Sequence, residues 1–398
     1  MAGRQCAIPG KDTRIYCRKR LVRPIVARMS IMGFSEVLQR RVRLGSWQDQ
    51  KISTYRKIHE AIDGGQWQQA RELAEYFVDE AAVCWNLYRQ WLADLEGFLR
   101  DEGTPEPDLQ EIRANLELVT RLPDGSTFDS NQMWERFNRL ISQVGAACSA
   151  HDAQAAHRAM DEAKEVWRQT HDRDVDMTYC YMSETARRYG DDAIPRMYER
   201  VLLPLFAWRY EKFDIDKYPW DEGLETLMYV ACEAMRGHLV GPERTGDFEL
   251  EEFADRFVLK FDPCGSGQRT IRGDWIEGTP ARMEPPYNWR VAQEERDWNH
   301  FTKGVCLYCA HCVILMEHMP IDRFGYPVRV VDPPVYPDTN RDPEVRQRCQ
   351  WTMYKDPTAV PEEVYTRTGR TKPKEFGSRA HGAVDLPDPT TFGMPGSG

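Results

Sequence analysis

The feature that most constrains this chain is a long run of helical periodicity in its first half. Over residues 66–103, apolar side chains recur at spacings of three and four. They are Leu73, Tyr76, Phe77, Ala81, Trp85, Tyr88, Trp91, Leu92, Leu95 and Leu99. An α-helix brings such positions onto one face. The run ends at Gly103 with prolines just beyond, as helices commonly do, so it predicts one long helix with a buried face.

Similar patterns continue up to Gly241 and predict further helices. They cover residues 107–121, 130–150, 151–190 (as one or two helices), 193–213 and 223–241. No fixed-period repeat joins them. We therefore predict a helical domain over residues 46–241, built as a bundle of six or seven helices.

After Gly241 the composition changes, because glycine and proline become frequent and β-type runs appear. The three runs that predict strands are residues 255–263, 326–334 and 348–356. A long irregular stretch and a short cysteine-bearing helix separate the first two. This order of strand, long loop, helix, strand and strand predicts an α+β module over residues 242–356. The fold class is thus α+β, with an N-terminal helical bundle followed by a smaller mixed α/β module that carries a cysteine-rich metal site.

The two ends of the chain differ from the rest in composition. Residues 1–45 are rich in arginine and nearly lack acids, which predicts a disordered or mis-started N-terminus. Met29 and Met32 are alternative starts, because MGFSEVLQRRV reads as the beginning of a helix. Residues 357–398 contain few apolar residues and much proline and glycine. They predict a disordered or surface-lying tail.

Charge and cysteine count limit the partners and the compartment. The formal net charge of -10 argues against nucleic-acid binding, which needs a basic face. No apolar run is long enough for a membrane span. The eleven cysteines are an odd number in a long chain, so we expect reduced thiols in the cytoplasm. The remaining partner is a small-molecule substrate or ligand, and homo-oligomerisation is left open.

The strongest chemical signal is the segment GVCLYCAHCVILMEHMP, residues 304–320, with cysteines spaced by three. A Cys-x-x-Cys pair places two thiolates near one cation. The three cysteines are Cys306, Cys309 and Cys312, and the candidates for a fourth ligand are Cys264, Cys349, His311 and His300. Cys264 is favoured, since it follows a predicted strand and sits in a Gly-Ser-Gly turn. We predict a bound metal, zinc first and an iron–sulfur cluster as the alternative.

Two other interpretations of these cysteines stay open. In the first, the three cysteines are buried thiols on a core helix, since cysteine is among the most buried residues. On a helix, however, positions spaced by three drift by about 60° per step, so all three face one ion only if the first turn is irregular. In the other interpretation one cysteine is a nucleophile that His311 or His300 activates without a metal.

A second signal is the cluster of charged residues in THDRDVDMTYCYMSE, residues 170–184. Asp172 and Asp176 would share one face of a helix, at positions i and i+4. His171 with Asp174 or Asp172 could form an acid/base or metal-binding pair. The alternative is a helix N-terminus, where acids complement the dipole and Thr170 is the cap.

A third signal is the glycine- and arginine-bearing stretch 265–290, between two predicted strands. It lacks the Gly-Lys-Ser/Thr of a P-loop. Loops of this length inside a compact domain usually serve a function, so we predict that it lines a pocket. Arg269 is the candidate for holding a carboxylate through two parallel hydrogen bonds. The alternative is an arginine on a solvated loop.

Residues 250–356 resemble two related groups of proteins through FDPCGSG, the cysteine-bearing helix, YPVRVV and RCQWTMY. One group is the V4R (4-vinyl reductase) small-molecule-binding domain, and the other is the L-2-amino-thiazoline-4-carboxylate hydrolase type. The first resemblance implies zinc bound by cysteines near the helix and in the last strand, which adds Cys349 as a ligand. The second implies hydrolytic opening of a small ring that contains sulfur and nitrogen. The cysteine spacing here is denser, and the helical N-terminal part has no counterpart in either group.

The leading hypothesis is therefore an intracellular, zinc-containing enzyme that acts on a small organic molecule by hydrolytic or lyase chemistry. Arg269 would orient the substrate, and His311 or His300 would carry the proton. A zinc held by four thiolates is closed and structural. In that case the helical region around His171 and Asp174 becomes the active-site candidate. The alternative is a non-catalytic small-molecule-binding or redox-sensing protein with a structural zinc or an iron–sulfur site.

Overall fold

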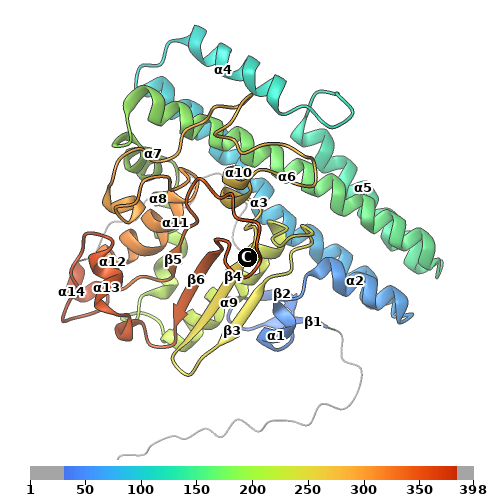
Figure 1. The fold of residues 1–398 in the computed structure, drawn as a ribbon. Helices are drawn as coiled ribbons and strands as arrows, with labels where there is room; N and C mark the ends of the chain where they lie inside the picture. Colours follow the sequence, from blue (N-terminus) through green and yellow to red (C-terminus); the bar gives the residue numbers. More distant parts are fainter. Residues whose placement is uncertain (1–30, 383–398) are drawn as a thin grey trace, which may run out of the picture. The chain divides into compact units, whose positions relative to one another are not determined.

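Long helices make up the first half of the fold in the computed structural model, which describes residues 31–382 (Figure 1). They are α2 (Thr54–Asp63), α3 (Trp67–Asp101), α4 (Glu106–Val119), α5 (Ser130–Ser149), α6 (Ala153–Tyr189), α7 (Ala193–Val201), α8 (Leu203–Arg209), η1 (Tyr210–Phe213) and α9 (Trp220–Gly237). Every stretch predicted as helical is helical, and the stretch 151–190 is one helix, whereas the stretch 193–213 is divided into α7, α8 and η1. Their assembly as a separate bundle domain stays a prediction.

The N-terminal end of the described chain is a hairpin rather than a helix. Strands β1 (Met32–Ser35) and β2 (Arg40–Arg43) pair antiparallel, and the short helix α1 (Trp47–Gln50) follows. The prediction that MGFSEVLQRRV begins a helix is therefore wrong. Gln39 turns the chain with a φ of 53°, and the hairpin buries Met32 and Val42 in the core. The calls on residues 1–28 lie outside the described residues.

A four-stranded antiparallel sheet forms the second half, in the order β3-β4-β6-β5. The strands are β3 (Glu249–Glu252), β4 (Arg256–Phe261), β5 (Val330–Asp332) and β6 (Cys349–Tyr354). The three predicted strands are confirmed, and β3 is an addition whose acidic sequence gave no β signal. The α+β class fits this arrangement. The register places Phe261 opposite Cys349, and this pairing brings the end of β4 to the start of β6.

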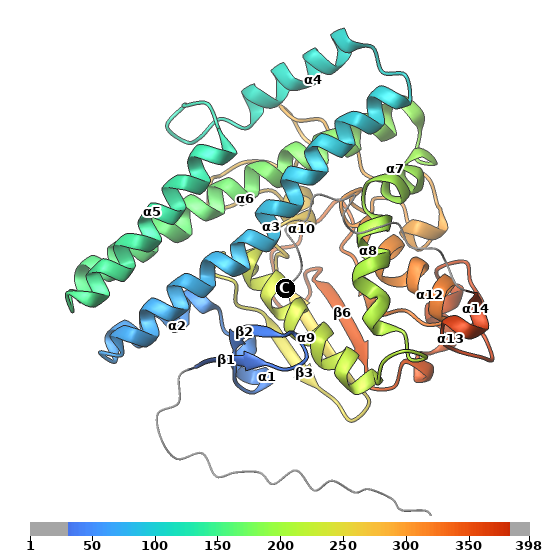
Figure 2. The same cartoon turned by 180° about the vertical axis from the view of Figure 1, so that it is seen from behind.

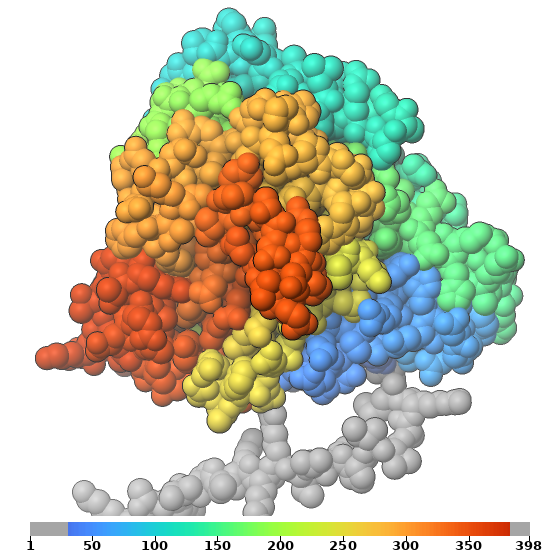
Figure 3. Space-filling model, in the orientation of Figure 1, coloured from blue at the N-terminus to red at the C-terminus, as the bar shows by residue number. Residues whose placement is uncertain are grey.

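Short helices and turns surround the sheet. They are α10 (Gly267–Arg272), η2 (Asp297–Asn299), α11 (Ala310–Val313), the π-helical turn η3 (Ile314–His318), α12 (Met319–Phe324), η4 (Pro357–Ala359), α13 (Glu362–Thr366) and α14 (Ser378–His381). In the space-filling view, the orange segments that follow β4 cover the centre of one face (Figure 3). In the predicted tail, Val364 and Tyr365 are buried in a cluster with Ile321 and Val330. Residues 383–398 lie outside the described part.

One hydrophobic core joins the helices to the sheet. Its members run from Met32 to Met353, and residues from Ile31 onward form one compact unit. Helix α9 overlaps the sheet in both ribbon views (Figures 1 and 2), and the contact is made by Trp220, which donates to the carbonyl of Tyr354 (3.2 Å) in β6. Its other side packs against α3. No helix within residues 31–382 is long and apolar enough to cross a membrane.

Helix α9 approaches α3 closely at Gly237. A Cβ added there would lie 2.4 Å from the main-chain oxygen of Glu80, which cannot move without the helix. We expect Gly237→Ala to lower the free energy of unfolding by about 2–3 kcal/mol, because overpacking forces the backbones apart. Urea denaturation followed by circular dichroism measures the change.

The matched control is Gly97→Ala in α3, where an added Cβ meets nothing within 4 Å. This substitution should raise stability by about 0.5–1 kcal/mol, since glycine is unfavourable inside a helix. Equal effects of the two substitutions would contradict the packing described here.

Candidate functional site

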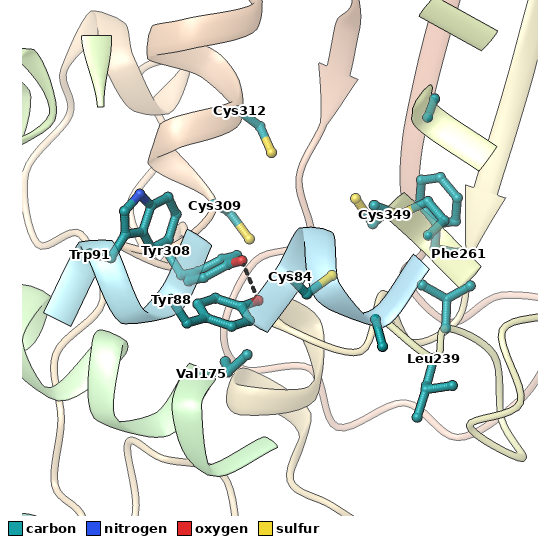
Figure 4. Packing of buried hydrophobic residues seen from close by; sticks show 14 of the residues in the cluster. Cys84, Tyr88, Trp91, Val175, Leu239, Phe261, Tyr308, Cys309, Cys312 and Cys349 are labelled. Atoms are coloured by element: carbon teal, nitrogen blue, oxygen red, sulfur yellow. Dashed lines mark hydrogen bonds between the residues drawn. The ribbon is translucent and has the colours of Figure 1, made fainter. Parts of the chain in front are cut away.

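Five cysteines from three separate stretches come together between α11 and the sheet, and we call them the cysteine site. They are Cys264, Cys306, Cys309, Cys312 and Cys349. Cys264 follows β4, and Cys349 begins β6 beside it. The thiols of Cys309 and Cys312 point toward that of Cys349 (Figure 4). Cys264 is partly exposed, and the other four are buried. This convergence is the densest group of reactive side chains that we find in the described chain.

The first pair in the cysteine site is Cys264 with Cys349. The thiol of Cys349 donates a hydrogen bond to the sulfur of Cys264, and the main-chain N–H groups of Gln268 (3.2 Å) and Ser266 donate to it as well. Together these bonds outweigh burial and hold the pKa of Cys264 well below its usual range, at about 6. The same bond raises the pKa of Cys349. These donors favour the thiolate form of Cys264 over that of Cys349.

The second pair is Cys306 with Cys309, at the predicted Cys-x-x-Cys spacing. Burial raises the pKa of Cys306, but hydrogen bonds from the thiol and the N–H of Cys309 more than compensate and lower it. Helix α11 begins only at Ala310, so the first turn is irregular, as a shared site requires. Gly267 lies against this pair, and a Cβ there would come within 2.4 Å of the Cys309 sulfur. Only glycine fits this position without displacing the thiol.

Two thiol–thiol hydrogen bonds pair Cys264 with Cys349 and Cys306 with Cys309. Among residues 31–382, no group of three or more histidine, cysteine, aspartate or glutamate side chains is placed to hold a metal ion. The donors therefore do not fit a zinc ion or an iron–sulfur cluster as they stand, because such sites need three or four ligands around one centre. Metal binding at Cys264, Cys306, Cys309, Cys312 or Cys349 stays a prediction.

A chain of hydrogen bonds leads from α6 toward the cysteine site. His171 contacts the carboxylate of Asp172 through Nδ1 (2.9 Å) and His238 through Nε2 (2.8 Å). Burial lowers the pKa of both histidines, that of His171 to about 4, so both rings are neutral. Because the carboxylate accepts from Nδ1 of His171, Nε2 of that ring accepts from Nδ1 of His238. His238 then keeps Nε2 as an unprotonated nitrogen.

Two tyrosines and one serine complete this chain. The hydroxyl of Tyr88 lies 3.3 Å from His238 and 2.8 Å from the hydroxyl of Tyr308, which Figure 4 shows beside Cys309. Ser266, two residues after Cys264, lies 3.2 Å from His238. Neutral nitrogen bases and sulfur nucleophiles thus occupy one buried region.

Asp172 and Asp176 hold this region in place through ion pairs. They share a face of α6, as predicted, and Arg269 contacts the carboxylates of both (3.4 and 2.6 Å). Arg244 binds both oxygens of Asp172 (2.7 and 3.0 Å), and Arg282 binds Asp176 (2.8 Å). The guanidinium of Arg269, expected to hold a substrate carboxylate, is therefore already engaged by two aspartates of the protein itself.

The remaining candidates lie in different surroundings. His311 belongs to the cysteine site, because its Nε2 lies 3.4 Å from the sulfur of Cys312. His300 pairs with Glu317 (2.9 Å) and not with a cysteine. Asp174 accepts from Ser130 (3.0 Å). Thr170 lies inside α6 and caps no helix, so the helix-start alternative for this segment is wrong.

The long loop after α10 lines a cavity, as predicted. The cavity has a volume of about 550 Å³ and lies between α6 and this loop. Its lining includes Arg168, Arg173, Glu277, Arg282 and Tyr287. Glu277 binds both Arg168 (2.8 Å) and Arg173 (2.6 Å), so most of the charge in the wall is compensated internally.

Sequence reasoning missed His238, Tyr88 and Arg329. His238 and Tyr88 stand in ordinary helical patterns and carry no local signal. Arg329 stands in YPVRVV, where a charged residue interrupts a run that reads as a buried strand. That interruption was the available signal, since buried arginines are rare unless they are paired.

No family model, curated protein or solved structure matches this chain. The resemblance of residues 250–356 to the V4R domain and to the thiazoline-carboxylate hydrolase type therefore stays a hypothesis. What the site can do has to be argued from its own side chains.

Asp174 provides a test of the electrostatics beside this site. Burial raises its pKa to about 7, whereas an unfolded chain has the usual value near 4. The folded state then binds more protons than the unfolded state between these values, so this group destabilises the fold as pH rises from about 4 to 7. We expect Asp174→Asn to gain stability relative to wild type over that range, by about 2–4 kcal/mol. Urea denaturation at several pH values measures it.

Asp176→Asn serves as the opposite case. Its carboxylate is ion-paired, and its pKa is lowered despite burial. The variant should lose stability at neutral pH and differ least from wild type in acid. The same pH trend for both variants would contradict the assigned surroundings.

Proposed function

We propose that this protein is an enzyme that acts on a small organic molecule through the sulfur of Cys264, with hydrolytic or lyase chemistry. One observation carries the proposal: the sulfur of Cys264, a partly exposed residue, accepts hydrogen bonds from a neighbouring thiol and two main-chain N–H groups, inside a cluster of four other cysteines. Purely structural cysteines are buried and inert, whereas reactive ones are accessible and stabilised as thiolates. Cys264 is the one partly exposed residue among the five cysteines, and hydrogen bonds at its sulfur favour the thiolate.

The surroundings of Cys264 supply the second component that such reactions need. Hydrolytic and lyase reactions require a group that takes up or returns a proton near neutral pH. His238 is neutral and keeps Nε2 unprotonated, and its protonated Nδ1 lies 3.2 Å from Ser266, on the loop that carries Cys264. Asp172 and His171 orient the ring through their hydrogen bonds. In this assignment Cys264 is the nucleophile and His238 the base, whereas His171 and Asp172 are positioning residues.

Replacing Cys264 by serine tests the proposal. Wild-type protein would be incubated with a panel of small amides, thioesters, cyclic imines and β-substituted amino acids, and products would be detected by mass spectrometry. We expect turnover within at least one class, reduced at least about 1,000-fold in Cys264→Ser, because a nucleophile and its base act as a unit. Cys148→Ser, a buried cysteine in α5 outside the site, should keep the wild-type rate. Full activity in Cys264→Ser, or no turnover of any class by wild type, contradicts the proposal.

A metal centre at the same thiols is a second candidate function. Main-chain N–H groups are directed at the sulfurs of Cys264 and Cys306, and such donors stabilise a thiolate with or without a metal. The cysteine site would have to contract for a metal, because the two pairs do not share a centre at present. No part of the chemistry proposed above depends on a metal.

Metal analysis separates the two candidates. For protein purified anaerobically without chelator, we expect substoichiometric zinc and iron, together with alkylation of Cys264 by iodoacetamide before the other four thiols. About one zinc per chain, or iron with inorganic sulfide, and a protected Cys264 would instead establish the second candidate and overturn the first.

A further inference from the structure

Arg329 is a buried cation without an acidic partner. Its side chain precedes β5, and the residue is only 6% exposed. Its Nη2 donates to the hydroxyl of Tyr210 (3.0 Å), and its Nε has no hydrogen-bond partner. Within residues 31–382, no carboxylate oxygen lies within ion-pair distance of its guanidinium. Leaving such a charge unpaired in the interior is costly, by several kcal/mol.

Other buried arginines in this fold show what Arg329 lacks. Arg236 holds Glu80 (2.5 Å), Arg244 holds Asp172 (2.7 Å), and Arg272 holds Asp338 (2.8 Å). In each case a carboxylate compensates the guanidinium. Arg43 is also buried without a carboxylate in contact, but its guanidinium donates to Thr54 and to three main-chain carbonyl oxygens. Arg329 has neither kind of compensation, and this difference points to an anion that comes from outside the chain.

The position of Arg329 connects it to the cysteine site. Its guanidinium stacks on the ring of Trp351, 4.4 Å from the ring centre. Trp351 and Cys349 are two residues apart on β6 and share its buried face. The main-chain N–H of Arg329 also donates to the carbonyl oxygen of Met316 (3.3 Å), which lies four residues after Cys312 in the continuous helical run of α11 and η3.

The cysteine site itself offers no counterion in contact with Arg329. The sulfur of Cys312 lies 3.4 Å from Nε2 of His311, and the guanidinium of Arg329 donates to the hydroxyl of Tyr210 instead. The nearby buried acid Glu317 is held by Arg367 (2.9 Å), by His300 (2.9 Å) and by the main-chain N–H of Val331. Its oxygens are therefore engaged elsewhere.

We propose that Arg329 binds the carboxylate of a small organic acid whose remaining atoms lie against Cys312 and Cys264. This inference deepens the proposed function and rests on it for the identity of the reacting thiol. Nε and Nη2 form one edge of the guanidinium, and such an edge binds the two oxygens of a carboxylate side by side. Trp351 covers one face of the group, and Tyr210 takes one Nη2 hydrogen. Arg329 thus takes the role that the sequence assigned to Arg269.

Paired alkylating reagents test the charge preference without a known substrate. Iodoacetate and iodoacetamide alkylate the same sulfur, which displaces iodide from either reagent. They differ only in that the first carries a carboxylate and the second an amide. We would measure the ratio of their rates at Cys264 by peptide mass spectrometry on the full native chain. We expect this ratio to exceed that of the urea-unfolded chain by at least about tenfold, since the ion pair with Arg329 favours the carboxylate by that order.

Substitution of Arg329 then assigns the effect. Arg329→Gln should lower the ratio at least about tenfold, whereas Arg329→Lys should keep most of it, because a charge remains. The matched control is Arg323→Gln. Arg323 is also mostly buried and stacked on an aromatic ring, Phe324, but it is engaged by Glu211 and the carbonyl of Ala207. An unchanged ratio in Arg329→Gln, or an equal loss in Arg323→Gln, would overturn the inference.

Protection of the wild-type protein gives a second readout in case Arg329→Gln does not fold. Sodium propionate should slow iodoacetamide labelling of Cys264, and sodium chloride at equal ionic strength should not. Protection by inorganic phosphate as strong as that by propionate would overturn the carboxylate assignment, and protection by neither anion would overturn the site. Neither readout needs turnover, so an anion site that survives in an inactive protein separates this inference from the proposed function.

Discussion

The ion pairs of Asp172 and Asp176 are the interaction on which the rest of the site depends. Both carboxylates point from one face of α6 into the interior, where Arg244, Arg269 and Arg282 converge on them. Arg244 lies in the turn after α9, Arg269 in the short helix α10, and Arg282 in the loop that follows α10. Removing one partner of such a buried pair leaves an uncompensated charge, at about 3–5 kcal/mol. The network therefore determines where the chain between α9 and α11 can run.

That constraint places the loop of Cys264 between a histidine and the remaining thiols. Gly265 has a φ of 77°, and a Cβ there would lie 2.2 Å from the main-chain oxygen of His238. Gly267 has equally little room beside Cys309. Two glycines thus let a backbone pass through a space that no side chain could share. The result is a sulfur and a neutral imidazole within one buried region, where low polarity strengthens every hydrogen bond between them.

Much of the fold follows from periodicity, and the exceptions have local causes. The apolar spacing of residues 66–103 predicts α3, and the β-type runs predict β4, β5 and β6, because each pattern reflects backbone geometry over a few residues. The hairpin β1–β2 was not predicted, because its short sequence matches a helical pattern equally well. Only the burial of Met32 and Val42 decides between helix and hairpin. Strand β3 is acidic and exposed, and pairing with β4 rather than its own propensity makes it a strand.

Within the site, the sequence by itself determined the Cys306–Cys309 pair and the shared face of Asp172 and Asp176, because spacings of three and four set these neighbours through the backbone alone. Only the tertiary structure decided that Cys264 meets Cys349, through the antiparallel register that sets Phe261 opposite Cys349. It also decided that Arg269 is engaged by acids and that Arg329 is not. Such pairings depend on which distant segments share a buried space, and no local pattern in the chain encodes that.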